Sequence, residues 1–159
     1  MTTRIRVAFM LTPVEFGGTE RVCLTLLKNI DRERFDVVPI LLTRPYERDN
    51  MFARQLSKEG YQIYEIPVAL RDKGDYLRVP RCFKLVWRAL RSQKFDLLHT
   101  NGYISDIVGI PVARLMRLPS VSTCHGYIRI NWKVWLYNVL DRIALKLGTQ
   151  VLAVSEAIR

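Results

Sequence analysis

Three polar clusters that follow apolar runs hold the residue types best suited to chemistry in this sequence. They are residues 17–21 (GGTER), residues 99–103 (HTNGY) and residues 125–126 (HG), and they include both histidines of the chain. Histidine can donate to a sugar hydroxyl or a phosphate and can move a proton near neutral pH. Adjacent glycines at a helix start bare backbone N–H groups, which bind anions together with the helix dipole. If the runs are parallel strands of one sheet, the clusters share one rim and form a site.

The glycine pair has two interpretations. Gly17 and Gly18 either form a strand-to-helix turn that needs a positive φ, or they bind a phosphate or diphosphate. Arg21 favours the second, because a cation in the first helical turn opposes the dipole unless an anionic ligand offsets it, whereas Glu20 has the favourable sign. The pattern is not G-x-G-x-x-G, and no acidic residue clearly ends the second predicted strand. Both facts argue against a nicotinamide or flavin dinucleotide.

The two histidines differ in how far their positions indicate function. His125 precedes Gly126, which lets another group approach closely, so a functional role is favoured over a structural one. His99 stands two positions before the turn dipeptide Asn101-Gly102, and a structural role for it, satisfying buried backbone groups, is equally compatible with this position.

Apolar periods of two and 3.6 residues alternate along the chain and define the elements that position these clusters. Strands are expected at residues 4–11, 35–43, 61–66, 95–99, 119–124 and 150–154, and helices at residues 20–30, 50–59, 80–92, 104–116 and 130–147. Residues 69–78 are expected to form a polar loop. This alternation predicts a single α/β domain with a Rossmann-like, doubly wound parallel sheet. In the common strand order, strands one, four and five are neighbours, and they carry the three clusters.

Composition bounds the class of protein and its partners. The chain has 159 residues, of which 49% are hydrophobic and 25% charged, enough for one domain with a substantial core. No apolar run approaches the roughly 20 residues that span a bilayer, and no signal peptide is recognisable. Cys23, Cys82 and Cys124 show no paired spacing, which indicates reduced thiols in a cytoplasmic protein. The net charge of +10 favours anionic partners such as phosphorylated ligands or the inner face of a membrane.

Basic residues gather on the third predicted helix. Lys84, Arg88 and Arg91 recur at helical spacing, and aromatic residues stand beside them and on the later helix 130–147. Two interpretations stay open: a solvated face on each helix with its aromatics in the core, or a surface that rests on anionic lipid. Nucleic acid is disfavoured, because no recognised binding motif is present. Ser155 would cap a further helix, of which the chain holds about one turn, so we expect it to be the front part of a longer protein.

Four segments in order carry a resemblance to a known family: residues 17–21, 96–101, 123–126 and 154–156. Together they resemble the N-terminal domain of GT-B-fold glycosyltransferases of family 4, the "glycosyl transferases group 1" type, over essentially the whole chain. The resemblance implies retaining transfer of a sugar from a nucleotide-sugar donor to an acceptor, in a cleft between two Rossmann-like domains. It implies no metal ion and no other cofactor. It also implies that the donor-binding C-terminal domain is missing, so that residues 1–159 alone should be inactive.

The same resemblance assigns roles to the clusters. His125 contacts the transferring sugar, and Gly17 and Gly18 approach the donor diphosphate, beside the basic Arg21. The remaining cluster residues are expected to line the cleft or bind the acceptor, which is a sugar or a lipid-linked molecule: Thr19, Glu20, His99, Asn101, Tyr103, Gly126 and Ser155.

Two other classes of function remain as alternatives. One is a non-enzymatic module that binds phosphorylated ligands or anionic membrane. The other is a different nucleotide-using α/β enzyme, such as a sugar-nucleotide epimerase. Epimerases of the dehydrogenase type need a dinucleotide fingerprint and a Tyr-x-x-x-Lys pair, and the sequence has neither, since Tyr61 is followed at that spacing by Glu65 and Tyr127 by Asn131.

Overall fold

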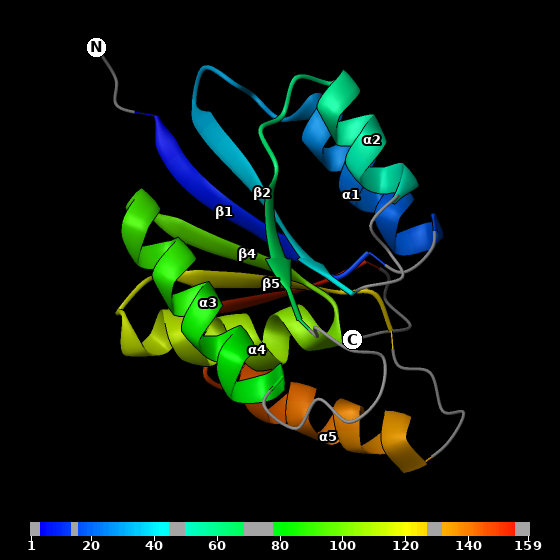
Figure 1. The fold of residues 1–159 in the computed structure, drawn as a ribbon, viewed down its shortest axis with the longest axis vertical. Coiled ribbons are helices and arrows are strands. Elements are labelled where there is room, and N and C mark those ends of the chain that lie inside the picture. The colour runs from blue at the N-terminus through cyan, green and yellow to red at the C-terminus, as the bar shows by residue number, and fades with distance from the viewer. Residues whose placement is uncertain (1–3, 14–15, 45–49, 69–77, 127–131, 155–159) are drawn as a thin grey trace.

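The computed structural model describes residues 4–13, 16–44, 50–68, 78–126 and 132–154, which form one parallel sheet with helices on both faces (Figure 1). The strands run in the spatial order β3-β2-β1-β4-β5-β6. They are β1 Ile5–Leu11, β2 Phe35–Thr43, β3 Tyr64–Pro67, β4 Leu97–Asn101, β5 Ser120–Cys124 and β6 Gln150–Ala153. The helices are α1 Gly18–Asn29, α2 Met51–Lys58, α3 Arg78–Gln93, α4 Tyr103–Leu115 and α5 Trp132–Leu145. The predicted doubly wound fold is confirmed, and β1, β4 and β5 are neighbours as expected.

Two apolar clusters hold the layers together. Leu24 and Leu27 of α1 pack with Phe52 and Leu56 of α2 against one face of the sheet. Helix α3 and helix α4 cover the other face, for example through Leu90, and α5 lies against α4 (Figure 1). No helix in the described ranges is long and apolar enough to cross a membrane.

The predicted element ends shift by a few residues where side chains make other contacts. Strand β3 begins at Tyr64 rather than at Tyr61, because the Tyr61 backbone N–H donates to the Leu56 carbonyl of α2 at 3.1 Å, and the Tyr61 hydroxyl donates to the Leu27 carbonyl at 2.6 Å. Strand β4 begins at Leu97 rather than at Phe95. The Asp96 side chain, just before the strand, accepts a hydrogen bond from the Arg6 backbone N–H at 2.8 Å. Residues 69–77 of the predicted loop lie outside the described residues, and Arg78 already belongs to α3.

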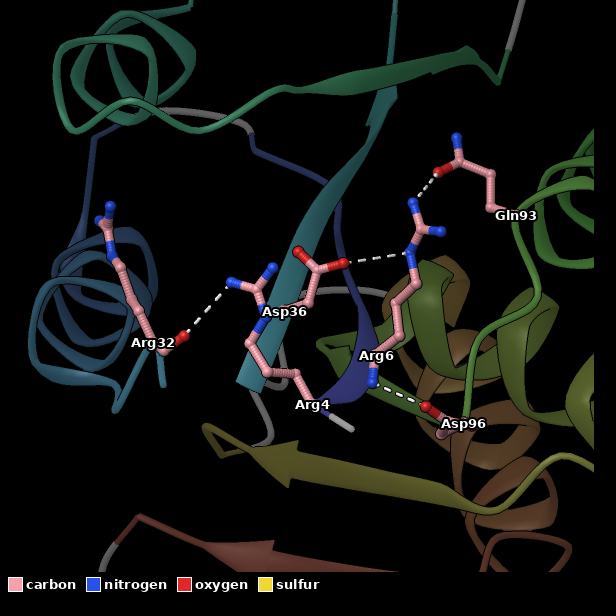
Figure 2. Close-up of polar contacts among 6 residues, drawn as sticks. All are labelled: Arg4, Arg6, Arg32, Asp36, Gln93 and Asp96. Carbon is pink, nitrogen blue, oxygen red and sulfur yellow. Dashed lines mark hydrogen bonds and ion pairs between the residues drawn. The ribbon is translucent and has the colours of Figure 1, made fainter. Parts of the chain in front are cut away.

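The amino-terminal rim of the sheet is held by arginines (Figure 2). The Arg6 guanidinium lies 3.4 Å from the Asp36 carboxylate and donates to the Gln93 side chain at 3.2 Å, which ties β1 to β2 and to the end of α3. Arg4 donates to the Arg32 carbonyl at 3.5 Å. A hollow of about 350 Å³ lies among these side chains. It is remote from the predicted site, because the clusters stand at the opposite ends of the strands.

The aromatic residues of the two basic helices are placed differently. Phe83 and Trp87 of α3 pack against the core, while Lys84, Arg88 and Arg91 are exposed, as their spacing predicts. In α5 the interpretation with aromatics in the core is wrong, since Trp132 is 69% exposed and Trp135 is 61% exposed. The side of α5 that packs inward carries other residues, described below.

Candidate functional site

The three clusters meet at the carboxyl ends of β1, β4 and β5. Leu11 pairs with Asn101, and Asn101 with Thr123, so the ends of these strands lie side by side. A pocket of about 310 Å³ opens there. Its lining comes from the strand ends and from α1, α4 and α5: Thr12, Thr19, Glu20, Arg44, Asn101, Gly102, Tyr103, Ile104, Asp106, Cys124, His125, Gly126 and Asp141.

Most of the predicted cleft residues share this pocket. The ones that line it are Thr19, Glu20, Asn101, Tyr103, His125 and Gly126. Gly17, Gly18, Arg21 and His99 are absent from the lining, although Gly17 and Gly18 immediately precede Thr19. Ser155 lies outside the described residues, so its role stays a prediction.

The glycine pair forms the start of α1, with Gly17 as the N-cap. The Glu20 carboxylate accepts the Gly17 backbone N–H at 3.1 Å, which closes the first turn. The φ of Gly17 is −97°, and neither glycine is among the described residues with positive φ. A Cβ added at Gly18 would meet no atom within 4 Å. The turn itself therefore does not require glycine at position 18, which leaves close approach of a ligand as a physical reason for Gly18. Arg21 is exposed, with its guanidinium 6.0 Å from the Phe16 ring.

His125 is a half-buried, neutral imidazole at the pocket. Burial lowers its pKa, and the nearby Glu20 carboxylate acts in the opposite direction. Its Nε2 atom is buried and has no hydrogen-bond partner among the described residues. A buried polar atom without a partner is costly, so its presence in the pocket lining is consistent with a ligand that supplies one.

Hydrogen bonds fix the loops around this imidazole. The Tyr103 hydroxyl donates to the Gly126 carbonyl at 2.9 Å, joining the start of α4 to the loop after β5. Gly126 and Gly102 have φ of +107° and +92°, a region that favours glycine. Ser105 donates to the Gly102 carbonyl at 2.7 Å and accepts the Asn101 backbone N–H at 3.1 Å. These contacts hold the pocket residues on ordered strand ends.

His99 is engaged inside the fold. Its Nε2 lies 2.8 Å from the Thr123 hydroxyl, and its ring meets the Phe9 ring edge-on at 4.9 Å. Burial, and secondarily His125, lowers its pKa to about 4. Of the two interpretations left open for His99, this geometry favours the structural one. His99 does not line the pocket, so the structure gives no support to its expected role in acceptor binding.

Sequence reasoning missed a pair of buried carboxyl groups at the base of the pocket. Asp106 of α4 and Asp141 of α5 are each 2% exposed. The Ser122 hydroxyl donates to Asp106 at 2.8 Å. Burial raises the pKa of Asp106 to about 8, and the adjacent Asp141 carboxyl adds to the rise against hydrogen bonds from Thr100 and Ser122. A signal was present in the sequence, because each aspartate is the only acidic residue of its helix.

Asp106→Asn should remove a pH dependence of stability. A raised folded-state pKa means that unfolding releases a proton, so stability is greatest below the unfolded pKa and is lost as pH rises towards about 8. His99 gives the opposite slope below its ordinary value of 6.5, which leaves the window between 6.5 and about 8 to Asp106. There the native chain should lose at most about 1.4 kcal/mol per pH unit.

Urea unfolding of the native chain and of Asp106→Asn, at several pH values between 6.5 and about 8, measures the change in unfolding free energy per pH unit. The matched control is Glu33→Gln, an exposed carboxyl whose loss should leave the slope unchanged. An Asp106→Asn chain that keeps the native slope would mean that Asp106 is ionised in the folded state.

A second, apolar pocket adjoins the first. It has about 140 Å³, lies where α3, α4 and α5 meet, and shares Arg44 and Ile104 with the polar pocket. Its other lining is mainly apolar: Val68, Val79, Cys82, Ile107, Val108 and Tyr137. A polar and an apolar compartment thus stand side by side. Among the described residues, no group of three His, Cys, Asp or Glu side chains is placed to hold a metal ion.

Solved structures share this fold. MurG of Acinetobacter baumannii is 15% identical with a TM-score of 0.73, and the alignment covers 98% of this chain and 42% of that one. Anabaena Alr3699/HepE, solved with UDP and glucose, is 18% identical with a TM-score of 0.70 and coverage of 97% and 39%. The UDP-GlcNAc 2-epimerase of Neisseria meningitidis, bound to UDP-GlcNAc, is 14% identical with a TM-score of 0.67 and coverage of 95% and 40%. The chain thus spans about two fifths of the length of these proteins, and at such identities the likeness shows the fold alone.

Sequence comparison adds the family. No curated protein matched the chain. The family model of Glycosyltransferase Family 4 matches residues 16–159, which include all three polar clusters. This match agrees with the resemblance of the ordered motifs and with the shared rim on which they lie. The chain therefore belongs to glycosyltransferase family 4.

Proposed function

We propose that this chain is the acceptor-side domain of an enzyme that moves a sugar from a nucleotide-sugar donor to an acceptor, with retention of configuration. The observation that carries the proposal is the convergence of the glycine-started helix α1 and the neutral His125 on one pocket rim. The family match and the shared fold of MurG and Alr3699/HepE support transfer of a sugar over the non-enzymatic alternative.

The start of α1 supplies the chemistry for the leaving group. When a nucleotide sugar reacts, negative charge grows on the diphosphate as the glycosidic bond breaks. The backbone N–H group of Gly18, with the positive end of the helix dipole, can stabilise that charge without a cation, while the N–H group of Gly17 already donates to the Glu20 carboxylate. Arg21, on the exposed side of the same helix, adds a positive charge near this position.

His125 supplies a hydrogen bond at the transferring sugar. Because its pKa is lowered, the ring is neutral at pH 7 and offers one N–H donor and one acceptor nitrogen. Gly126 next to it has no side chain to block the sugar. The Nε2 atom, which has no partner in the part of the chain that the structure describes, is the group that we assign to the sugar.

The acceptor is proposed to be lipid-linked. Its polar head would occupy the pocket beside Asn101, and its apolar part the compartment between α3, α4 and α5. Arg44 lines both pockets, where a basic group suits a phosphate that joins the head to the tail. The enzyme would then work at the inner face of a membrane.

Titration with nucleotide sugars tests whether this chain or a second domain holds most of the donor contacts. We propose that a second domain holds most donor contacts, so the 159-residue chain should bind nucleotide sugars very weakly and transfer nothing. Calorimetry with UDP-sugars and GDP-sugars measures this. A Kd at or below about 1 μM, a binding free energy of about −8 kcal/mol, would show that this chain carries its own donor site.

The reaction itself is tested in the enzyme that contains this domain. Transfer to a lipid extract, dependent on nucleotide sugar and giving a product with the donor's anomeric configuration, would support the proposal. Epimerised sugar released without any need for acceptor would instead favour the chemistry of the UDP-GlcNAc 2-epimerases that share the fold.

A further inference from the structure

Helix α5 carries polar residues on its buried side and apolar residues on its exposed side, which is the reverse of an ordinary surface helix. Its inward side carries the polar residues Asn138 and Asp141, which are buried. Its outward side carries Trp132, Trp135, Leu136, Leu140 and Ile143, all exposed. Trp132, Leu136, Leu140 and Ile143 recur at intervals of four, four and three residues, and Trp135 lies three residues from Trp132, so the five form one continuous apolar stripe along about 17 Å of helix. In a water-exposed helix the polar residues are expected on this side.

The charge around the stripe has a single sign. Arg142 in α5 and Lys146 just after it are exposed, and Asp141, the only acidic residue of the helix, is buried. Helix α3 lies on the same face of the sheet (Figure 1), and its exposed residues Lys84, Arg88 and Arg91 add to the positive charge of that face. An apolar stripe with tryptophans and a basic border, without an exposed carboxylate on the helix, matches the interface of an anionic bilayer.

We propose that α5 lies in the interface of an anionic lipid bilayer, with Trp132, Trp135 and Ile143 among the acyl chains and Arg142 and Lys146 at the head groups. This deepens the lipid-linked acceptor proposed above and rests on it. The apolar pocket supports the same occupant, because Tyr137 of α5 lines it. An acceptor tail could therefore pass from the bilayer beside α5 into the compartment next to the reaction rim.

Lipid fits the stripe better than a second copy of the chain. A copy would bring its own α5 and its own excess of positive charge, and the net charge is +10. Like charges at the border of an interface oppose association, whereas anionic head groups neutralise them.

Vesicle co-sedimentation tests the proposal. The chain should bind vesicles of phosphatidylethanolamine and phosphatidylglycerol, and bind phosphatidylcholine vesicles much less. High salt should weaken the binding, because the Debye length falls from about 10 Å at 0.1 M to 3 Å at 1 M. Trp135→Glu with Ile143→Glu should lower the partition coefficient by about tenfold or more, since it places two charges at acyl-chain depth.

The matched control is Val22→Glu with Leu26→Glu, the same change on exposed apolar positions of α1 across the sheet. That variant should bind within about twofold of the native chain. Circular dichroism checks that each variant is folded. If the α5 variant binds as the native chain does, or if both double variants lose binding equally, the proposal is wrong.

Tryptophan fluorescence gives a second measurement of vesicle binding, and it leaves the apolar residues of α5 unsubstituted. In a Trp87→Phe background the two α5 tryptophans are the only ones left of three. Their emission should shift to the blue on anionic vesicles and be quenched by brominated acyl chains. No shift would overturn the proposal, and so would a dimer in solution that Trp135→Glu dissociates. In the enzyme that contains this domain, vesicle binding without any sugar transfer would count against the proposed function alone, and transfer without vesicle binding against this inference alone.

Discussion

His125→Ala is expected to lower the turnover of the sugar-transferring enzyme by about 10²–10³, because one positioned hydrogen-bonding group in a water-poor site contributes that much. The imidazole lines the rim pocket and has a buried Nε2 without a partner among the described residues. Removing it should leave the fold intact, since His125 is only half-buried and the Gly126 loop stays tied to Tyr103. Initial rates with saturating donor and acceptor, set beside the melting temperature, measure both quantities.

His99→Ala is the matched control for that experiment. It deletes the same side chain from a place where the ring packs on Phe9 and bonds to Thr123. It should cost stability of about 1–3 kcal/mol and leave the turnover of the folded fraction nearly unchanged. The reverse result, a His125→Ala enzyme with native turnover and a lower melting temperature, would make His125 a structural residue.

The fold followed from local patterns that do not depend on distant contacts. Alternation of apolar periods placed every described strand and helix, and turn residues such as Gly60 ended them near the observed positions. The right-handed crossover then leaves few strand orders for such a chain. The first residues of β3 and β4 were less predictable, because Tyr61 and Asp96 make contacts with residues that are 34 and 90 positions away in the sequence.

The site was predictable at its strand ends and less so on its helices. Asn101 and His125 follow strands, so their common rim could be inferred. Asp106 and Asp141 come together only because α4 packs on α5, and no sequence spacing encodes that contact. Periodicity in α5 predicted an apolar face but not its direction, because the contact of Asp141 with Asp106 of α4 is not encoded in the spacing of α5.

The fold alone also does not choose the reaction. MurG and a putative UDP-N-acetylglucosamine 2-epimerase of Listeria monocytogenes match the fold of this chain equally well, with TM-scores of 0.73 and 0.75. In the proposed reaction the choice depends on groups at the rim, chiefly the start of α1 and His125, because function belongs to sites rather than to folds.

Substitution of Gly18 should separate stability from function. Gly18 is the first residue of α1, its φ is not positive, and an added Cβ would meet no atom within 4 Å. Gly18→Ala should therefore stabilise the chain by about 0.5–1 kcal/mol, because alanine loses less backbone entropy on folding. The same methyl group would stand where a diphosphate approaches the backbone N–H groups. We expect the donor KM of the enzyme to rise, by about tenfold or more in Gly18→Val, with the acceptor KM unchanged.

Gly60→Ala is the control, and it should change the free energy of unfolding in the opposite direction. Gly60 has a φ of +80°, so alanine there should cost about 1–2 kcal/mol, and the donor KM should not change because Gly60 stands at the far rim. Thermal unfolding and donor titrations at fixed acceptor measure the two effects on each variant. If Gly18→Val keeps the native donor KM, the glycine pair is only a turn. If Gly18→Ala lowers stability instead, the first turn of α1 depends on glycine for a reason other than a ligand.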